Sequence, residues 1–179
     1  MTNTQKAALD SAQRYREKMF SFLGDRDPLE VLSQTANGLG EIVKKHSVTV
    51  LQTRPFQGKW TANEVIGHLC DGEWVYGYRL RVILSEDKPI ILGTNQDSWV
   101  ASLRHNEREP SELVQIFTNL RNLNLAEWKR TPPADLRRSG QHSERGPESL
   151  DTMLRLLAGH DLSHLSQIAT CIQTLAPPK

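Results

Sequence analysis

The sequence lacks a long apolar run. Hydrophobic residues make up 37% of the chain, and no stretch of about 20 residues is apolar enough to cross a bilayer. The chain also lacks an excess of charge, because 22 Lys and Arg residues face 21 Asp and Glu residues and leave a formal charge of +1. These two absences exclude an integral membrane protein and predict neither a membrane nor a nucleic-acid partner.

Cysteine is scarce, since Cys70 and Cys171 are the only two in the chain. Residues 1–18 are polar and of mixed charge, without the apolar core of a secretory signal. Two cysteines without an export signal favour reduced thiols over a disulfide, and we expect a cytoplasmic protein. At 179 residues the chain has the length of one domain with one core.

Strand-type alternation is almost absent, and residues 89–92 are the single strand candidate. Apolar residues instead recur every three or four positions, and capping residues or prolines mark where the segments begin. The predicted helices cover residues 6–23, 28–50, 61–86, 110–130 and 147–175, and Pro177 and Pro178 are expected to end the last of them. This pattern predicts an all-α protein: a four-helix bundle with crossover connections over residues 27–176, preceded by a short N-terminal helical extension over residues 1–26.

Three of the six histidines occupy predicted core-facing helix positions. His160 and His164 lie one turn apart in the apolar stripe of the last helix, so both rings can converge on one ion. His68 lies on the core-facing side of the 61–86 helix, where Gly72 leaves room beside its ring. Packed core histidines are the alternative. Burying three imidazoles without partners is costly, however, and this favours a shared divalent metal with an open fourth position, as in catalytic sites.

Other polar residues have two interpretations each. Asp71 and Asp161 can orient the imidazoles by accepting their second N–H, or they can be solvated surface carboxylates. His105 and His142 fall in the two long connections, where exposure is expected. His46, at the far end of its helix, is expected to be packed or partly exposed.

Arginines and one tryptophan complete the candidates. Arg79 lies on the same face of the 61–86 helix as His68. A core-facing arginine needs a carboxylate or a substrate anion as its partner. We expect structural pairing and keep Arg79 as a candidate cofactor-binding residue. Arg137, Arg138 and Arg145 are expected to be solvated, although they could bind a carboxylate. Trp99 is expected to anchor its connection rather than to form a lid.

Several motifs together resemble the DinB-like superfamily. They are Lys59-Trp60-Thr61, residues 64–69, Asp71, Glu73-Trp74, Arg79, Arg81, residues 96–99 and residues 158–168. The resemblance implies a four-helix bundle of up-down-down-up order that binds one divalent metal, nickel or zinc in many members, through three histidines. These are His68, His160 and His164 here. Members include proteins named as metal-dependent hydrolases and thiol-dependent transferases or isomerases that use bacillithiol, mycothiol or glutathione, and dimers are frequent.

Residues and resemblance together predict a metal-dependent enzyme that acts on a small molecule. The ion would be nickel, zinc or iron, and it would activate a water for hydrolysis or a low-molecular-weight thiol for S-transfer. The alternative is a non-catalytic metal-binding bundle dimer with a structural or stress-response role. The two classes differ in whether any substrate is turned over.

Overall fold

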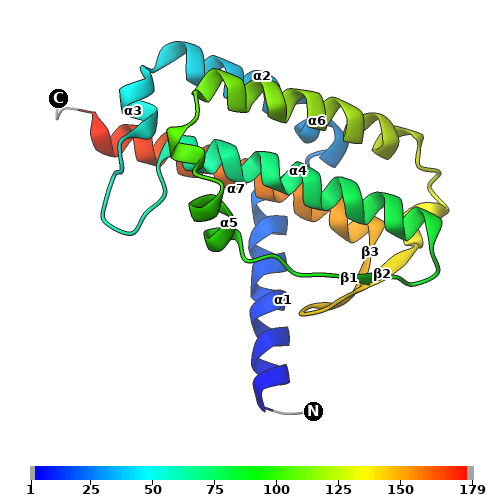
Figure 1. Cartoon of the computed structure of the whole chain (residues 1–179). Coiled ribbons are helices and arrows are strands. Elements are labelled where there is room, and N and C mark those ends of the chain that lie inside the picture. Colours follow the sequence, from blue (N-terminus) through cyan, green and yellow to red (C-terminus); the bar gives the residue numbers. More distant parts are fainter. Residues whose placement is uncertain (1–2, 177–179) are drawn as a thin grey trace.

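The computed structural model describes residues 3–176, with side chains from residue 10 onward. Four long helices form a bundle: α2 (Pro28–Lys45), α4 (Ala62–Ser85), α6 (Pro110–Arg130) and α7 (Leu150–Leu175). Helices α2 and α4 each pack on both α6 and α7. Following the colours in Figure 1, α2 and α7 run in one direction, and α4 and α6 run in the other. The all-α four-helix bundle of up-down-down-up order is therefore confirmed.

Side-chain caps fix where the bundle helices begin. The Asp27 carboxylate accepts a hydrogen bond from the Glu30 backbone N–H at 3.0 Å, with Pro28 in the first turn. Thr61 and Glu64 form the reciprocal capping box expected from their spacing. Both helix starts were thus correctly predicted.

The helix predicted over residues 28–50 is divided in two. Helix α2 ends at Lys45, and the short α3 (Val48–Gln52) begins after Ser47, whose hydroxyl accepts a hydrogen bond from the Val50 backbone N–H at 3.3 Å. Between them His46 is extended, with φ −125° and ψ 141°. The apolar spacing continues across this break, so periodicity alone missed the change of direction that the serine cap produces.

A small sheet accompanies the bundle. Strand β1 (Ile90–Ile91) confirms the strand candidate and pairs in parallel with β2 (Ser139–His142), which forms an antiparallel hairpin with β3 (Gly146–Ser149). The hairpin was missed because its residues are mostly polar. Pro147, expected in the first turn of the last helix, lies in β3, and Ser149 caps α7 instead. The connection over residues 87–109 also contains α5 (Gln96–Ser102) and a 3-10 turn (His105–Glu107).

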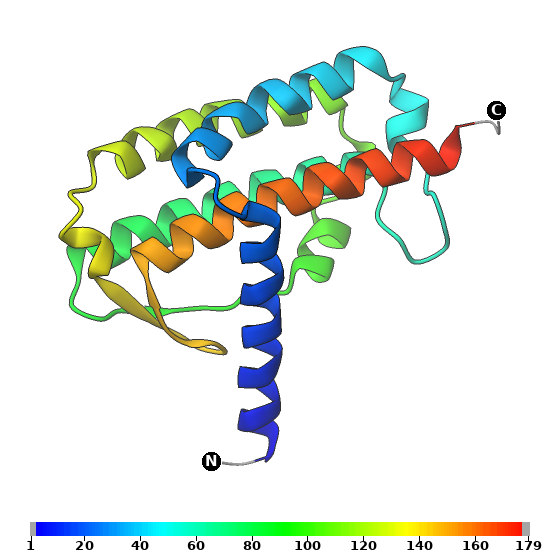
Figure 2. The same cartoon turned by 180° about the vertical axis from the view of Figure 1, so that it is seen from behind.

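Helix α1 (Asn3–Leu23) projects from the side of the bundle (Figures 1 and 2). Its C-terminal turns pack on α7 through the buried side chains of Met19 and Leu23. A Cβ at Gly159 of α7 would overlap the Met19 carbonyl, so this close crossing requires glycine. Pro177 and Pro178 lie outside the described residues. No helix among the described residues is long and apolar enough to cross a membrane.

A buried ionic cluster joins all four bundle helices. Arg121 of α6 is 2% exposed, and its guanidinium donates to Glu73 Oε1 of α4 at 2.7 Å and to Asp161 Oδ2 of α7 at 2.7 Å. The same guanidinium donates to the Leu32 carbonyl of α2 at 2.9 Å, and the Thr35 hydroxyl donates to Asp161 at 2.6 Å. Along every helix this layer lies between two apolar clusters, one at each end of the bundle.

Removing the central cation should be strongly destabilising, because two buried carboxylates would lose their partner. We expect Arg121→Ala to lower the free energy of unfolding by about 3–5 kcal/mol in urea denaturation. Lys44→Ala is the control, since Lys44 pairs with Glu41 at 3.2 Å on the surface and should change stability by less than about 1 kcal/mol. Equal effects of the two substitutions would contradict the central role of Arg121.

Candidate metal centre

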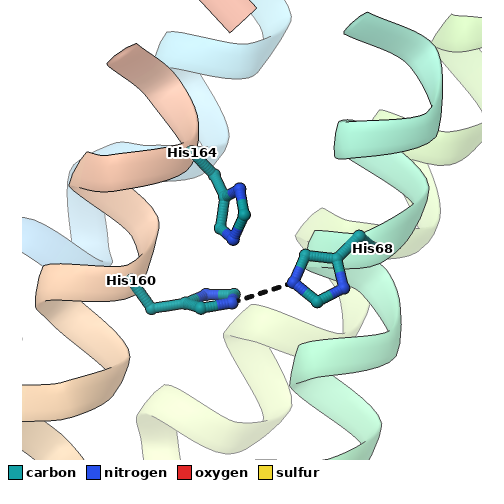
Figure 3. A group of neighbouring side chains, drawn as sticks. All are labelled: His68, His160 and His164. Atoms are coloured by element: carbon teal, nitrogen blue, oxygen red, sulfur yellow. Dashed lines mark hydrogen bonds between the residues drawn. The ribbon is translucent and has the colours of Figure 1, made fainter. Parts of the chain in front are cut away.

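His68, His160 and His164 come together where α4 faces α7 (Figure 3). One ring nitrogen of each lies within 4.8 Å of the others, and His68 Nε2 is 2.9 Å from His160 Nε2. The His164 ring stands edge-on to both, with ring centroids 4.3 Å from His160 and 4.7 Å from His68. The structure thus brings together all three residues that the sequence singled out as ligands.

Burial keeps these imidazoles neutral. Burial, with smaller contributions from His164 and His105, lowers the pKa of His68 to about 3. The pKa of His160 lies well below its ordinary value, chiefly through burial and also through His164, His68 and the nearby Arg121. A neutral imidazole offers the lone pair that a metal needs, so binding near pH 7 requires no deprotonation.

The hydrogen bonds around the rings fit a shared ion. His164 Nδ1 lies 2.8 Å from Gln167 Oε1 and donates to it, which leaves Nε2 unprotonated. His160 Nδ1 is buried and has no partner among the described residues. Without an ion, one Nε2 of the His68–His160 pair must donate to the other, whereas an ion would accept both lone pairs. Three neutral imidazoles suit Zn²⁺, Ni²⁺ or Fe²⁺.

Asp71 and Asp161 were expected either to orient the imidazoles or to lie on the surface, and both expectations were wrong. Neither carboxylate accepts a hydrogen bond from the three rings, and both residues are buried. Asp161 belongs to the Arg121 cluster. Asp71 Oδ2 accepts a hydrogen bond from His105 Nε2 at 2.8 Å. His105 is 3% exposed, so the expectation that it lies on the surface was also wrong.

The position of His105 depends on a recess in α4. A Cβ at Gly67 would overlap the His105 imidazole, so the glycine leaves the space that this ring fills. The Asn63 side chain of the same helix donates to the His105 carbonyl at 2.9 Å. Gly67, a helix-unfavourable residue directly before His68, was the one local signal of this close approach. Gly72 plays a lesser part, because its Cβ would make ordinary contact with His160, not with His68.

His142 is also buried, at 1% exposure, and the expectation of a surface position was wrong. Its Nε2 lies 3.2 Å from Arg79 Nη2, and its Nδ1 accepts the Glu144 backbone N–H at 3.1 Å. Burial, with contributions from Arg145 and Arg79, lowers the pKa of His142 to about 4 and keeps it neutral. His46 is partly exposed, as expected.

The arginines differ in their partners. Arg79 is 4% exposed and donates to the Leu92 carbonyl, but among the described residues no carboxylate pairs with it, so the expected structural pairing was wrong. Arg145 pairs with Glu148 through contacts of 2.7 and 2.8 Å, and Arg138 donates to two carbonyls near the end of α4. These two were expected to be solvated and are not, whereas Arg137 is exposed.

Neither cysteine contributes to the centre. Cys70 and Cys171 are buried free thiols, as predicted. Burial, reinforced by Asp71, raises the pKa of Cys70 to about 12, which makes it a poor nucleophile.

A pocket of about 430 Å³ opens beside the histidines. His68 and His160 line it together with residues of α1, α5 and the tip of the β2–β3 hairpin. Trp99 of α5 is one of these lining residues, so it forms part of the pocket wall and does more than anchor its connection. The candidate metal centre is therefore accessible to a small molecule.

Comparison with known proteins places this arrangement in a family. The model of the DinB superfamily matches residues 32–168, which include all three histidines. The chain belongs to the DinB superfamily. Two bacterial relatives bear the name "Putative metal-dependent hydrolase". The one from Oceanobacillus iheyensis is 26% identical over 121 residues, 67% of this chain and 69% of its own. The one from Bacillus mycoides is 22% identical over 147 residues, 82% of this chain and 84% of its own.

A solved structure that is similar to this DinB-superfamily chain supports the fold. YfiT from Bacillus subtilis, described as a probable metal-dependent hydrolase with an unusual four-helix bundle topology, superposes with a TM-score of 0.76. The two chains are 21% identical, and the match covers 82% of this chain and 84% of YfiT. The likeness confirms the helix order of the bundle.

Metal binding by the three histidines can be measured directly. We expect about one divalent ion per chain by elemental analysis of untagged protein, and an excess of 100 times the Kd should stabilise the fold by about 2.7 kcal/mol. His160→Ala should abolish both effects, whereas His46→Ala, outside the cluster, should leave them unchanged. Metal uptake by His160→Ala with wild-type affinity would contradict the assignment.

The recess at Gly67 gives a second prediction. Gly67→Ala should lower the free energy of unfolding by about 1–3 kcal/mol, because the new methyl group displaces His105. Gly38→Ala is the matched control: a Cβ there meets nothing within 4 Å, so the same substitution should stabilise α2 by up to about 1 kcal/mol. Thermal unfolding of the two variants should therefore give shifts of opposite sign, and shifts of the same sign would refute the recess.

Proposed function

We propose that this protein is a metal-dependent hydrolase of small molecules, with one divalent ion held by His68, His160 and His164. The observation that carries the proposal is the convergence of three neutral imidazoles within 4.8 Å beside an open pocket. The names of the two relatives support the same reaction class. When bound, the ion would supply Lewis-acid chemistry and lower the pKa of a coordinated water or thiol.

Asp71 is the residue that we assign to proton transfer. It lies one helical turn after His68 on α4 and lines the same pocket. His105 holds Oδ2 by its hydrogen bond, and among the described residues no hydrogen bond occupies Oδ1. Asp71 Oδ1 would accept the proton of the nucleophile and return it to the leaving group. The recess at Gly67 therefore positions the base through His105.

A thiol S-transferase is the second candidate. It is favoured by the basic side of the pocket, where Arg79 and Arg145 could bind a carboxylate of bacillithiol or glutathione. Asp71 would then take the proton of the thiol. The remaining alternative, a non-catalytic metal-binding dimer, differs from both because it predicts metal-dependent stability without turnover.

Turnover by the metal-loaded protein distinguishes these candidates. One screen offers ester and amide substrates, and the other offers bacillithiol, mycothiol and glutathione with an electrophile. In the active screen we expect Asp71→Asn to lower kcat by roughly 10²–10⁴-fold while the metal content stays at the wild-type value. Asp97→Asn, the same change at an exposed position of α5, is the control and should keep full activity.

Each outcome of these screens points to one candidate. Hydrolysis that requires both His160 and Asp71 supports the proposal. Thiol transfer without hydrolysis selects the second candidate, and a metal-dependent rise in Tm with no turnover selects the non-catalytic dimer. Wild-type activity in Asp71→Asn would refute the assigned base and leave the metal centre intact.

A further inference from the structure

Arg79 is a buried cation for which the structure provides no anion. At 4% exposure, its guanidinium contacts the Leu92 carbonyl and His142 Nε2, and no carboxylate among the described side chains pairs with it. The residues whose side chains are not described, 1–9 and 177–179, contain no Asp or Glu. The charge of Arg79 therefore has no acidic side chain as an ion-pair partner, because Glu148, whose charge acts on Arg79, pairs with Arg145.

Arg79 lies in a cluster with His142, Arg145, Glu148, Tyr15 and Tyr76, and these groups do not neutralise its charge. His142 is uncharged, and the second guanidinium of the cluster, Arg145, is matched by Glu148. Tyr15 and Tyr76 complete the cluster, and burial raises the pKa of both, so neither is a phenolate near pH 7. The cluster carries one net positive charge on the pocket wall.

Two further carboxylates line the pocket, Asp71 and Glu144, and neither forms an ion pair with Arg79. Asp71 is bonded to His105, about two helical turns before Arg79. Glu144 is exposed and packs against Gly93, where water screens its charge. Neither carboxylate therefore serves as the ion-pair partner of the Arg79 guanidinium.

The contrast with Arg121 shows how unusual this is within the same molecule. Arg121 is equally buried, and two carboxylates within 2.7 Å balance it. A buried charge without such partners destabilises a fold, and a ligand that supplies the missing charge accounts for its retention. Arg79 also lines the pocket that contains His68 and His160, so a ligand can reach both ends of one cavity.

We propose that Arg79 binds the carboxylate of a small-molecule substrate, while the reacting group of that molecule lies beside His68 and His160. The second half of this statement rests on the proposed function, and the first half does not. One unbalanced charge matches a carboxylate better than a phosphate dianion, and the planar guanidinium can bind both carboxylate oxygens. Tyr15 and Tyr76 line the pocket next to this anion subsite.

The helix also sets the shape of the substrate. The Cα atoms of His68 and Arg79 are about 16 Å apart along the axis of α4, at roughly 1.5 Å per residue. Val75 and Tyr76 line the pocket between them. The substrate is therefore elongated, with its carboxylate and its reacting group at opposite ends of an apolar middle section.

The anion subsite can be tested without the metal. Hexanoate and its neutral analogue hexanamide are titrated into metal-free protein, and binding is followed by the arginine Nε–H signals in proton–nitrogen correlation spectra. We expect hexanoate to bind roughly 10- to 100-fold more tightly, as for a hydrogen bond to a charged group. Arg79→Met should bind the two ligands equally. Inorganic phosphate should bind more weakly than hexanoate.

Stability separates a ligand-binding role of Arg79 from a structural one. Arg79→Met should leave the Tm unchanged or raise it, because it removes an unpaired buried charge and because Leu92 is an exposed residue, where water can replace the lost donor to the carbonyl. Arg121→Met, the matched substitution at a paired arginine, should lower the Tm. An Arg79→Met protein that unfolds, or that keeps its preference for hexanoate, overturns the proposal. Equal binding of hexanoate and hexanamide by the wild type, or tighter binding of phosphate, overturns it as well.

A final arm links the subsite to the metal centre. Zinc-loaded protein is titrated with 8-(hydroxyamino)-8-oxooctanoate, whose hydroxamate binds metals, and with its methyl ester. We expect the acid to bind at least about tenfold more tightly and Arg79→Met to abolish the difference. If hexanoate is preferred in the first arm but zinc does not enable hydroxamate binding, the anion subsite stands and the proposed metal-dependent function fails. If the hydroxamates bind but acid and ester bind equally, the reverse holds.

Discussion

The contact between one guanidinium and two carboxylates at the middle of the bundle determines how its helices are aligned. Arg121 reaches Glu73 on α4 and Asp161 on α7, and each carboxylate lies within two turns of a histidine of the candidate metal centre. A slide of one helix by a turn, 5.4 Å, would leave a buried carboxylate unpaired. Because the ion pairs oppose such a slide, His68 stays opposite His160, and the histidine cluster follows from the ionic layer.

Two aspartates close to the histidines have different roles because they leave their helices in different directions. Asp161 follows His160 directly and is therefore rotated by about 100°, toward the bundle centre and Arg121. Asp71 follows His68 by three residues, nearly a full turn, and so remains on the pocket side. One carboxylate consequently belongs to the architecture, and the other faces the space where a substrate would lie.

Features encoded by local spacing could be predicted from the sequence, and those made by distant contacts could not. Capping residues and apolar periodicity were enough to predict the bundle helices. The positions of His68, His160 and His164 on the core-facing sides of those helices were enough to predict that the three rings meet. The burial of His105 and His142 depends on connections that fold back on α4. The core-facing position of Arg79 was correctly predicted. That no carboxylate pairs with Arg79 could not be predicted, because its surroundings are formed by the β2–β3 hairpin, whose polar strands carry little strand signal.

One part of the pocket wall comes from α1, through Ser11, Ala12 and Tyr15. These residues precede the segment shared with the DinB superfamily, residues 32–168, which contains all three histidines and Arg79. The metal-binding side of the cavity and the part of its wall that α1 supplies therefore belong to segments of the chain that can diverge at different rates. Since α1 supplies no metal ligand, changes in its pocket-lining residues would reshape the cavity while His68, His160, His164 and Arg79 are retained, a modular route by which one bundle could acquire new substrates.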